Sequence, residues 1–427
     1  MLTLLVLVFL VFLVCVLIRI PIAFAMGISI FFASMVSERI PMVIVTSRMF
    51  AGLDSFPMMA IPFFLLAGNV MNASGMTDRL FAFSNCLVGH LRGGLGHVTV
   101  VAAMIVAGMS GSALAEAGGL GIIAIKAMRD RGYDGPFSAA LMASAATIGP
   151  IIPPSIPMVV FGAMVGVSTG RLFLGGIVPG ILMGLSLMSI VYFFAKKHNY
   201  PVESRPGIWQ ILIALKDSLW ALFTPVIILG GIISGMFTPT EAAAVAALYG
   251  LFVSVFVYRS MGWSAFWEVL RHTAQFTAVI MLIIAMANAF GWVVGLTQMP
   301  ALVAKYMGAW NKLVVIATIN ILLLILGCLM EAIAILLIVT PIFLPMMMKI
   351  GVDPVHFGVF MILNLMIGLL TPPVGLGVYL VSKVADIPAV PIFRACGRFL
   401  VPLIIVLILI SYFDQLVLFV PDLLMGK

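Results

Sequence analysis

The 427-residue chain is 63% hydrophobic and only 9% charged, whereas a soluble domain carries about 25% charged residues, and this excludes a soluble globular protein. The net charge of +7 comes from basic residues scattered through short loops, as in membrane proteins, so no nucleic-acid partner is expected. The absence of a GxxxxGK[ST] motif excludes a P-loop ATPase. At about 20 residues per span, the apolar content predicts roughly ten to twelve membrane segments.

The first predicted element is the apolar run MLTLLVLVFLVFLVCVLI at residues 1–18. It has neither a basic start nor a small-residue cleavage site, and further apolar segments follow it. We therefore predict a retained membrane span rather than a cleaved signal peptide.

The stretch AGMSGSALAEAGGLG, residues 107–121, is dense in small residues and carries Ser110, Ser112 and Glu116. Small residues in a membrane segment indicate either close helix packing or the tip of a re-entrant hairpin. A proline-rich break follows about 40 residues later, and a hairpin tip and a broken helix can together surround one ion. This pairing favours a hairpin, at about residues 98–126.

The stretch TIGPIIPPSIPM, residues 147–158, has four prolines in an apolar run. A proline inside a helix removes a backbone donor and clashes with the preceding turn, which costs about 3 kcal/mol or more. In hydrocarbon no water satisfies the freed carbonyl oxygens. We therefore predict a broken helix at about residues 136–165, whose bare carbonyls bind a cation.

The longest polar interval, residues 196–216, lies near the middle of the chain. Its basic residues are Lys196, Lys197, Arg205 and Lys216. Because cytoplasmic loops are enriched in Lys and Arg, we predict a basic cytoplasmic linker here. The linker separates a first membrane repeat, residues 1–195, from a second, residues 217–427.

Two long stretches indicate that the halves are related. GYDGPFSAALMASAATIGPIIPP begins at Gly132 and GVDPVHFGVFMILNLMIGLLTPP begins at Gly351, and an offset of 219 residues aligns them without a gap. The offset matches Gly149 with Gly368 and the first Pro-Pro pair with the second. Such halves are typical of secondary transporters, whose sites lie at broken helices near the repeat interface.

The second half contains the corresponding elements: a predicted hairpin at about residues 314–348 and a predicted broken helix at about residues 355–385. Glu331 lies in this hairpin, and an acidic residue inside a membrane span indicates a functional site. It could bind a cation, relay a proton, or accept hydrogen bonds from the hairpin tip, and these alternatives stay open.

Polar side chains near the breaks have two interpretations. The hydroxyls of Ser155 and Thr371 could ligate Na⁺ or hold a substrate carboxylate, or they could bond back to the freed helix carbonyls. Four asparagines in apolar runs are expected to form interhelical hydrogen bonds rather than to act as ligands: Asn69, Asn72, Asn288 and Asn364. The predicted fold is an all-α polytopic membrane protein of two inverted repeats, each with a re-entrant helical hairpin and a Pro-broken helix.

Five stretches in order along the chain resemble the large membrane subunit of tripartite ATP-independent periplasmic (TRAP) transporters. They are LLAGNVMNASG, SGSALAEAGGLG, TIGPIIPPSIPMVVFG, FTPTEAAAVAALYG and DPVHFGVFMILNLMIGLLTPPVG, and the resemblance covers nearly the whole chain. One departure concerns the second hairpin, where that family often has Asp followed by Pro and this chain has Glu331 followed by Ala332.

The resemblance implies a multi-pass permease of the bacterial inner membrane that works by an elevator mechanism, with a scaffold and a mobile transport domain. It implies Na⁺-coupled uptake of an organic acid anion of the sialic acid or C4-dicarboxylate class, with Na⁺ as coupling ion and no organic cofactor. The implied partners are a small four-helix membrane subunit and a periplasmic substrate-binding protein.

The resemblance also implies site residues. The first Na⁺ site would use Ser110, Gly111, Ser112, Gly149, Pro150 and Pro153. The second would use Gly327, Glu331, Gly368, Thr371 and Pro372. The substrate carboxylate would lie near Ser112, Ser155 and Thr371.

Two other functions compete with this one. The first is a stand-alone anion carrier or Na⁺/H⁺ exchanger that needs no binding protein, with Glu331 as proton carrier. The second is an intramembrane enzyme that uses Glu331 and Glu116. Hydrolytic chemistry would need a metal cluster or an activated nucleophile at close spacing, and the sequence shows neither.

Overall fold

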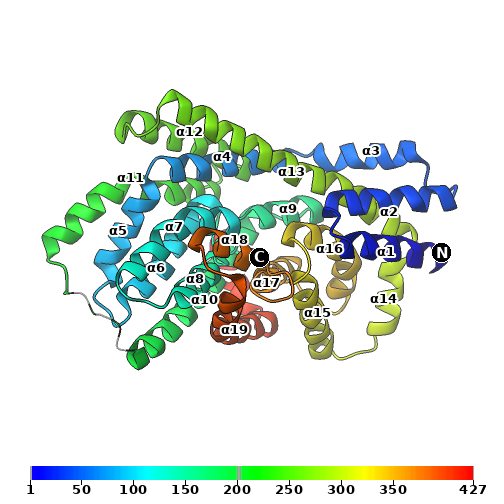
Figure 1. Ribbon diagram of the computed structural model, residues 1–427. Helices are drawn as coiled ribbons and strands as arrows, with labels where there is room; N and C mark the ends of the chain where they lie inside the picture. The colour runs from blue at the N-terminus through cyan, green and yellow to red at the C-terminus, as the bar shows by residue number, and fades with distance from the viewer. Residues whose placement is uncertain (1, 199, 201, 203, 427) are drawn as a thin grey trace.

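The computed structural model describes residues 2–198, 200, 202 and 204–426, and all regular structure within these ranges is helical (Figure 1). The prediction of an all-α protein is confirmed. The parts of the predicted repeats and linker that fall on residues 1, 199, 201, 203 and 427 lie outside the described residues.

Three helices at one end of the molecule, blue in Figure 1, begin the chain. They are α1 (Leu2–Leu17), α2 (Ile22–Val36) and α3 (Met42–Leu53). Pro21 and Pro41 stand directly before α2 and α3, where proline is tolerated because the first backbone N–H groups of a helix have no helical acceptor. Helix α1 packs on α2, and α2 and α3 both contact α13 (Trp263–Leu296).

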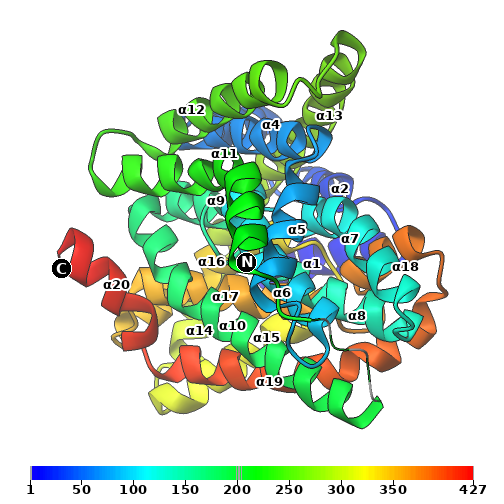
Figure 2. The same cartoon turned by 90° about the vertical axis from the view of Figure 1, so that its left-hand side faces the viewer.

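An outer layer of helices lies along the top of Figures 1 and 2. It contains α4 (Ala60–Ala73), which a 3₁₀ turn at Phe56–Met59 precedes, α12 (Pro239–Phe252) and α13; a π-helical turn at Val253–Val257 follows α12. Helix α11 (Ile208–Ile233) lies below α12 and packs against it. Helix α4 packs on α12 and α13, and α5 (Met76–Val88) packs on α11. Large apolar side chains of α11, including Trp209 and Phe223, are exposed, which is expected of a surface that faces lipid.

The segments that carry the first predicted site form a helical hairpin and an interrupted helix. Their helices are α6 (Gly94–Ser110), α7 (Ala113–Asp130), α8 (Gly135–Ala146) and α9 (Ile156–Val165). Two residues join α6 to α7, and an irregular segment at 147–155 separates α8 from α9. Helix α10 (Thr169–His198) then leads to the linker.

The second half contains the same order of elements. Its helices are α14 (Met299–Met307), α15 (Lys312–Gly327), α16 (Ala332–Lys349), α17 (Pro354–Gly368), α18 (Leu376–Ala385), α19 (Ala389–Tyr412) and α20 (Gln415–Met425). Helices α7 and α16 have 18 residues each and begin 219 residues apart, at Ala113 and Ala332. Asp134 and Asp353, also 219 apart, cap α8 and α17. The starts of these helices therefore recur with the offset of the sequence repeat.

The two interrupted helices lie in the centre of the protein. All ten residues from Phe137 to Ala146 of α8 and all fourteen from Val355 to Gly368 of α17 are buried. A helix that is apolar on every side is a core helix. Because the backbone breaks follow these buried helices, they lie where membrane proteins tolerate irregular backbone, surrounded by protein rather than by lipid.

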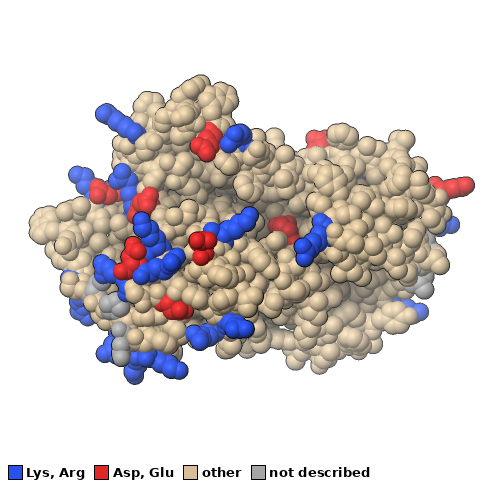
Figure 3. All heavy atoms as spheres, viewed as in Figure 1, with Lys and Arg blue, Asp and Glu red and all other residues tan. Residues whose placement is uncertain are grey.

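Seven helices of the described chain are long and apolar enough to cross a membrane. Composition alone predicts more spans, because it also counts the apolar residues of the hairpin arms and the interrupted helices, several of which are shorter than a full span. Figure 3 shows Lys and Arg gathered at the end of the molecule where α5, α10 and α11 lie, whereas most of the visible face is uncharged.

Candidate functional site

The tip of the first hairpin lies against the first break. Ser112 caps α7, where its Oγ accepts the N–H of Ala115 at 3.4 Å. Gly111 has a φ of +61°, and its carbonyl oxygen accepts the N–H of Ile156 at 3.3 Å. A side chain at Gly111 would place its Cβ 2.6 Å from the carbonyl oxygen of Pro154. The fold thus brings together the tip and the proline segment, as the first predicted site requires.

Ser110, the last residue of α6, is buried, and its hydroxyl has no hydrogen-bond partner in the described part of the chain. Gly68 of α4 allows this close packing, since a Cβ at Gly68 would lie 3.2 Å from the Cα of Ser110. A buried hydroxyl without a partner is rare in native proteins and indicates a missing ligand or water. Ser110 therefore remains a candidate ligand.

The prolines of the first break determine which carbonyl oxygens lack donors. In a continuous helix the carbonyls of Gly149 and Pro150 would accept N–H groups four residues later, but those residues are Pro153 and Pro154, which have none. The hydroxyl of Ser155 donates to the Pro150 carbonyl instead. Among the hydrogen bonds of the described chain, none reaches the carbonyl oxygen of Gly149. This oxygen is free to bind a cation.

In the second half the backbones of tip and break touch directly. A Cβ at Gly368 would lie 2.6 Å from the Cα and carbonyl carbon of Gly327. The carbonyl oxygen of Cys328 accepts the N–H groups of Val374 at 3.2 Å and Gly375 at 3.4 Å. Gly327 and Gly368, both in the second predicted site, are therefore neighbours.

In the second break, both carbonyls that lose their helical donors to the proline pair find other donors. Pro372 and Pro373 remove the donors for Gly368 and Leu369, but the Gly368 carbonyl accepts both the N–H of Thr371 at 3.0 Å and its hydroxyl at 2.8 Å. The carbonyl of Leu369 accepts the N–H of Gly377 at 3.2 Å. The Thr371 hydroxyl thus donates its proton to the helix, and the lone pairs of its Oγ1 remain available to an ion.

Glu331 caps α16. Its Oε2 accepts the N–H groups of Ile333 at 2.9 Å and Ala334 at 3.1 Å. This geometry corresponds to the alternative in which the carboxylate accepts hydrogen bonds at the hairpin tip, where an anion also benefits from the helix dipole.

Glu116 is a site residue that the predicted ligand sets omit. It lies in the first turn of α7, is fully buried, and its carboxylate contacts Gly149 of the first break. The sequence signal was an acidic residue four positions after Ser112 within a small-residue run, but no pattern indicated which backbone it would face.

The family of the chain follows from comparison with known proteins. A family model described as "Tripartite ATP-independent periplasmic transporter, DctM component" matches residues 9–416. The chain belongs to this TRAP permease family. This large permease is accordingly a multi-pass protein of the bacterial inner membrane.

Named relatives cover most of the permease. It is 46% identical over 381 residues to the sialic acid TRAP transporter large permease protein SiaM of Vibrio cholerae, covering 89% of each chain. It is 43% identical over 380 residues to the C4-dicarboxylate TRAP transporter large permease protein DctM of Pseudomonas aeruginosa, covering 88% of each. These relatives are named as permeases, not as enzymes.

The fold of the permease resembles that of a solved transporter with little sequence similarity. The YdaH transporter of Alcanivorax borkumensis matches with a TM-score of 0.64 at 14% identity, covering 86% of this chain and 87% of that one. The resemblance supports a membrane-transporter fold.

The three hydroxyls predicted near the substrate differ in their surroundings. Ser112 and Thr371 are half-buried. Ser155 is fully buried, and its hydroxyl donates to the Pro150 carbonyl while accepting the N–H of Met158 at 3.2 Å. Ser155 therefore holds the break together, as the back-bonding interpretation predicts, whereas Ser112 and Thr371 remain the accessible members of the set.

Polar pairs between helices support the site. The amide of Asn364 on α17 donates to the carbonyl and the side-chain oxygen of Asn320 on α15, at 3.0 and 2.8 Å. Asn69 of α4 donates to the hydroxyl of Thr273 on α13 at 2.9 Å. Asn72 of α4 accepts the hydroxyl of Thr77 on α5 at 2.8 Å. The predicted interhelical role is confirmed for Asn69, Asn72 and Asn364, whereas the side chain of Asn288 makes no hydrogen bond among the described residues and its role stays a prediction.

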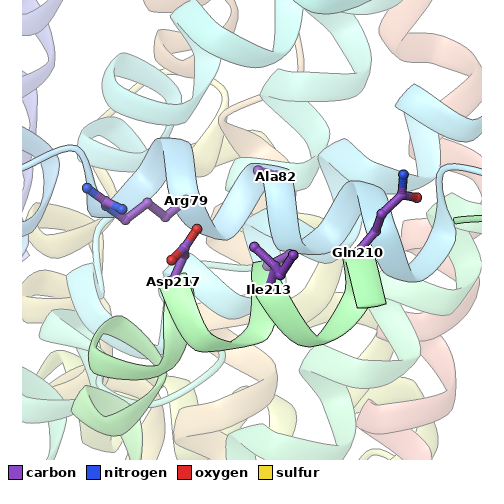
Figure 4. Close-up of a pocket in the computed structure, with 6 residues that line it drawn as sticks. Arg79, Ala82, Gln210, Ile213 and Asp217 are labelled. Carbon is purple, nitrogen blue, oxygen red and sulfur yellow. The ribbon is translucent and has the colours of Figure 1, made fainter. Parts of the chain in front are cut away.

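A cavity of about 280 Å³ lies elsewhere, between α5 and α11 (Figure 4). Its lining residues are Arg79, Ala82, Gln210, Ile213, Ala214 and Asp217. Because no residue of a hairpin tip or a break lines it, it is not a candidate for the transport site.

Replacing Ser155 with alanine tests the first break. Loss of the α9 cap costs about 1 kcal/mol, and the buried Pro150 carbonyl left without a donor costs about 1–3 kcal/mol more. We expect Ser155→Ala to lower the apparent melting temperature of the purified permease by several degrees. Ser189→Ala on α10, where an exposed hydroxyl bonds to the Leu185 carbonyl, is the control and should change it little. Equal shifts would contradict the assigned role of Ser155.

Proposed function

We propose that this TRAP large permease takes up an organic acid anion together with Na⁺ by an elevator mechanism. The observation that carries the proposal is the first break, where Pro153 leaves the buried Gly149 carbonyl without a donor beside the hairpin tip. Unwound carbonyls of this kind hold Na⁺ or H⁺ in secondary transporters. No cluster of three or more His, Cys, Asp or Glu was found in the described residues, which fits a carbonyl-bound monovalent ion better than a tightly held divalent metal.

The names of several relatives support a substrate class, although one at 40% identity is named for isethionate, a sulfonate. Their names specify sialic acid, C4-dicarboxylate and, in an Escherichia coli relative at 40% identity, 2,3-diketo-L-gulonate. All three are carboxylates. We therefore propose an organic acid anion of the sialic acid or C4-dicarboxylate class, bound near Ser112 and Thr371.

The proposed partners are a periplasmic substrate-binding protein that delivers the anion and a small four-helix membrane subunit. The words "tripartite" and "periplasmic" in the family description support both. The mobile domain would consist of the two hairpins and the two interrupted helices, and the long outer helices would form the scaffold. The two halves would be inverted repeats, and the basic linker would face the cytoplasm.

The second Na⁺ would bind between the second tip and the second break, near Gly327, Gly368 and Thr371. The contact between the two glycine backbones supports this position. The exchanger alternative, with Glu331 as proton carrier, receives less support because the Glu331 carboxylate already accepts two backbone N–H groups.

Ion coupling can supply the required free energy. A tenfold Na⁺ gradient contributes about 1.4 kcal/mol per ion, and each net charge that moves inward contributes about 2.3 kcal/mol per 100 mV. Two Na⁺ ions with a monoanion carry one net positive charge inward and gain from the membrane potential. With a dicarboxylate the same cycle is electroneutral.

Uptake into liposomes tests the proposal. The permease is reconstituted with its small subunit and binding protein, and uptake of labelled sialic acid or succinate is measured under an inward Na⁺ gradient, an inward H⁺ gradient, or neither. We expect uptake only when Na⁺ and the binding protein are both present. Uptake that H⁺ alone drives, or that needs no binding protein, would refute the proposal in favour of the stand-alone carrier.

A further inference from the structure

Glu116 is an acidic side chain in the core that lacks a visible counter-charge. It is 0% exposed, and neither of its carboxylate oxygens has a hydrogen-bond partner in the described part of the chain. Burying an isolated carboxylate is strongly unfavourable, so buried carboxylates are paired, bind a metal ion or are neutral. Glu331 presents no such problem, because backbone N–H groups compensate it.

The Glu116 carboxylate faces the backbone of the first break. An alanine methyl at Gly149 would overlap Oε2 and would lie 3.5 Å from the Cδ of Glu116 and 3.3 Å from the carbonyl oxygen of Ala146. Gly149 thus has no side chain where the carboxylate approaches. This contact joins the second arm of the first hairpin to the interrupted helix that follows it.

The neighbouring backbone offers oxygen atoms rather than donors. The carbonyls of Thr147 and Gly149 accept none of the hydrogen bonds found in the described chain, and Pro150 and Pro153 have no N–H to give. A carboxylate buried beside this segment has no hydrogen-bond donor among the described residues, and a cation held between it and these carbonyls would compensate its charge. Oxygen-only sets of this kind bind hard cations and exclude anions.

The charge of the set fits a monovalent cation. One carboxylate balances one positive charge, and no group of three or more His, Cys, Asp or Glu side chains that could hold a metal ion was found among the described residues. Glu116 also lies in the first turn of α7, where the helix dipole favours the ionised form. A cation bound at the site would stabilise the ionised carboxylate further.

We propose that Glu116 is a ligand of the first Na⁺ site and supplies its negative charge, together with main-chain carbonyls at Thr147 and Gly149. The inference rests on the proposed Na⁺ coupling and adds a residue to the site. The offset of 219 places Ile335 at the corresponding position of the second half, where the acidic residue of the hairpin is instead Glu331, the cap of α16.

Na⁺ binding to purified protein tests this proposal without relying on transport. The permease in complex with its small subunit is titrated with NaCl against choline chloride at constant ionic strength, and the apparent melting temperature and bound ²²Na⁺ are recorded. We expect Glu116→Gln to weaken Na⁺ binding at least tenfold, and Glu116→Asp, which keeps the charge, to weaken it less. The control Glu268→Gln removes an exposed carboxylate on α13 and should leave the titration unchanged.

The outcomes distinguish the inference from the function on which it rests. If the wild-type permease shows Na⁺-dependent uptake and Glu116→Gln binds Na⁺ as tightly as wild type, only the role of Glu116 is refuted. A variant that is equally destabilised in Na⁺ and in choline, with an unchanged Na⁺ titration, would also refute it and assign Glu116 a structural role. If Glu116→Gln does not fold, the Na⁺ affinity of Glu116→Asp tests the proposal instead. Its side chain is one methylene shorter, so a Na⁺ affinity equal to that of wild type would refute direct ligation by Glu116. A wild-type protein that neither binds Na⁺ nor needs it for uptake would refute the proposed function itself.

Discussion

Replacing Gly368 with alanine is expected to reduce Na⁺-driven uptake at least tenfold. The new Cβ would lie 2.6 Å from the Cα and carbonyl carbon of Gly327, whereas carbon atoms in contact prefer about 3.5–4.0 Å. Both neighbours are backbone atoms, so no side chain can rotate away. The second hairpin tip would have to separate from the break, and the proposed second Na⁺ site would be lost.

The stability of the same variant gives an independent measurement. Alanine in place of a helical glycine normally stabilises by about 0.5–1 kcal/mol, whereas overpacking a core costs about 1–3 kcal/mol. We expect the second effect to exceed the first and lower the melting temperature of Gly368→Ala. Gly118→Ala on α7 is the matched control, because no atom lies within 4 Å of a Cβ at that position. If both variants transport equally well, the close contact of Gly327 with Gly368 is not required.

Replacing Gly111 with alanine is expected to have a comparable effect on the first site. Gly111 has a φ of +61°, a conformation that costs an L-residue about 1–2 kcal/mol. Its Cβ would also lie 2.6 Å from the carbonyl oxygen of Pro154, which would force the hairpin tip away from the break. We expect at least a tenfold loss of uptake and a weaker Na⁺ dependence, measured in the same liposomes.

A second glycine separates the two causes. Gly132, in the turn between α7 and α8, has a φ of +79°, but no atom lies within 4 Å of a Cβ there. Gly132→Ala therefore carries the backbone strain without the overlap and should keep most of its uptake. A loss as large as that of Gly111→Ala would show that strain alone accounts for the effect and that contact with Pro154 is unimportant.

Several features of the site were accessible from sequence because they follow from local chemistry. The paired prolines at 153–154 and 372–373 had to interrupt helices, and the helices before them, α8 and α17, end at Ala146 and Gly368. The roles of individual carbonyls were not accessible. Which carbonyl oxygens lack donors depends on the direction of the Ser155 and Thr371 hydroxyls. From the sequence, either hydroxyl could have bound an ion or donated to a freed helix carbonyl.

Glu331 and Glu116 show the same difference between what local sequence indicates and what tertiary packing decides. In sequence Glu331 was the conspicuous acid, because it stands alone in a long apolar run, whereas Glu116 was one polar residue among several small ones. In the structure Glu331 caps its own helix, and Glu116 is buried against Gly149 without a partner. Capping is a local interaction, but the contact between α7 and the first break depends on how two separate elements pack.

The amino-acid sequence by itself determined that this protein is a helical membrane protein, and that a helix breaks at each of two Pro-Pro pairs 219 residues apart. The first property follows from the apolar composition of the whole chain. The second follows from the missing N–H of proline, whose effect is confined to a few neighbouring residues. Only the tertiary structure decided that glycine backbones bring each hairpin tip against a break, and that the first break keeps an unpaired carbonyl beside a buried carboxylate. These contacts join residues between about 30 and 45 positions apart, and close packing of glycines, not local propensity, sets their distances.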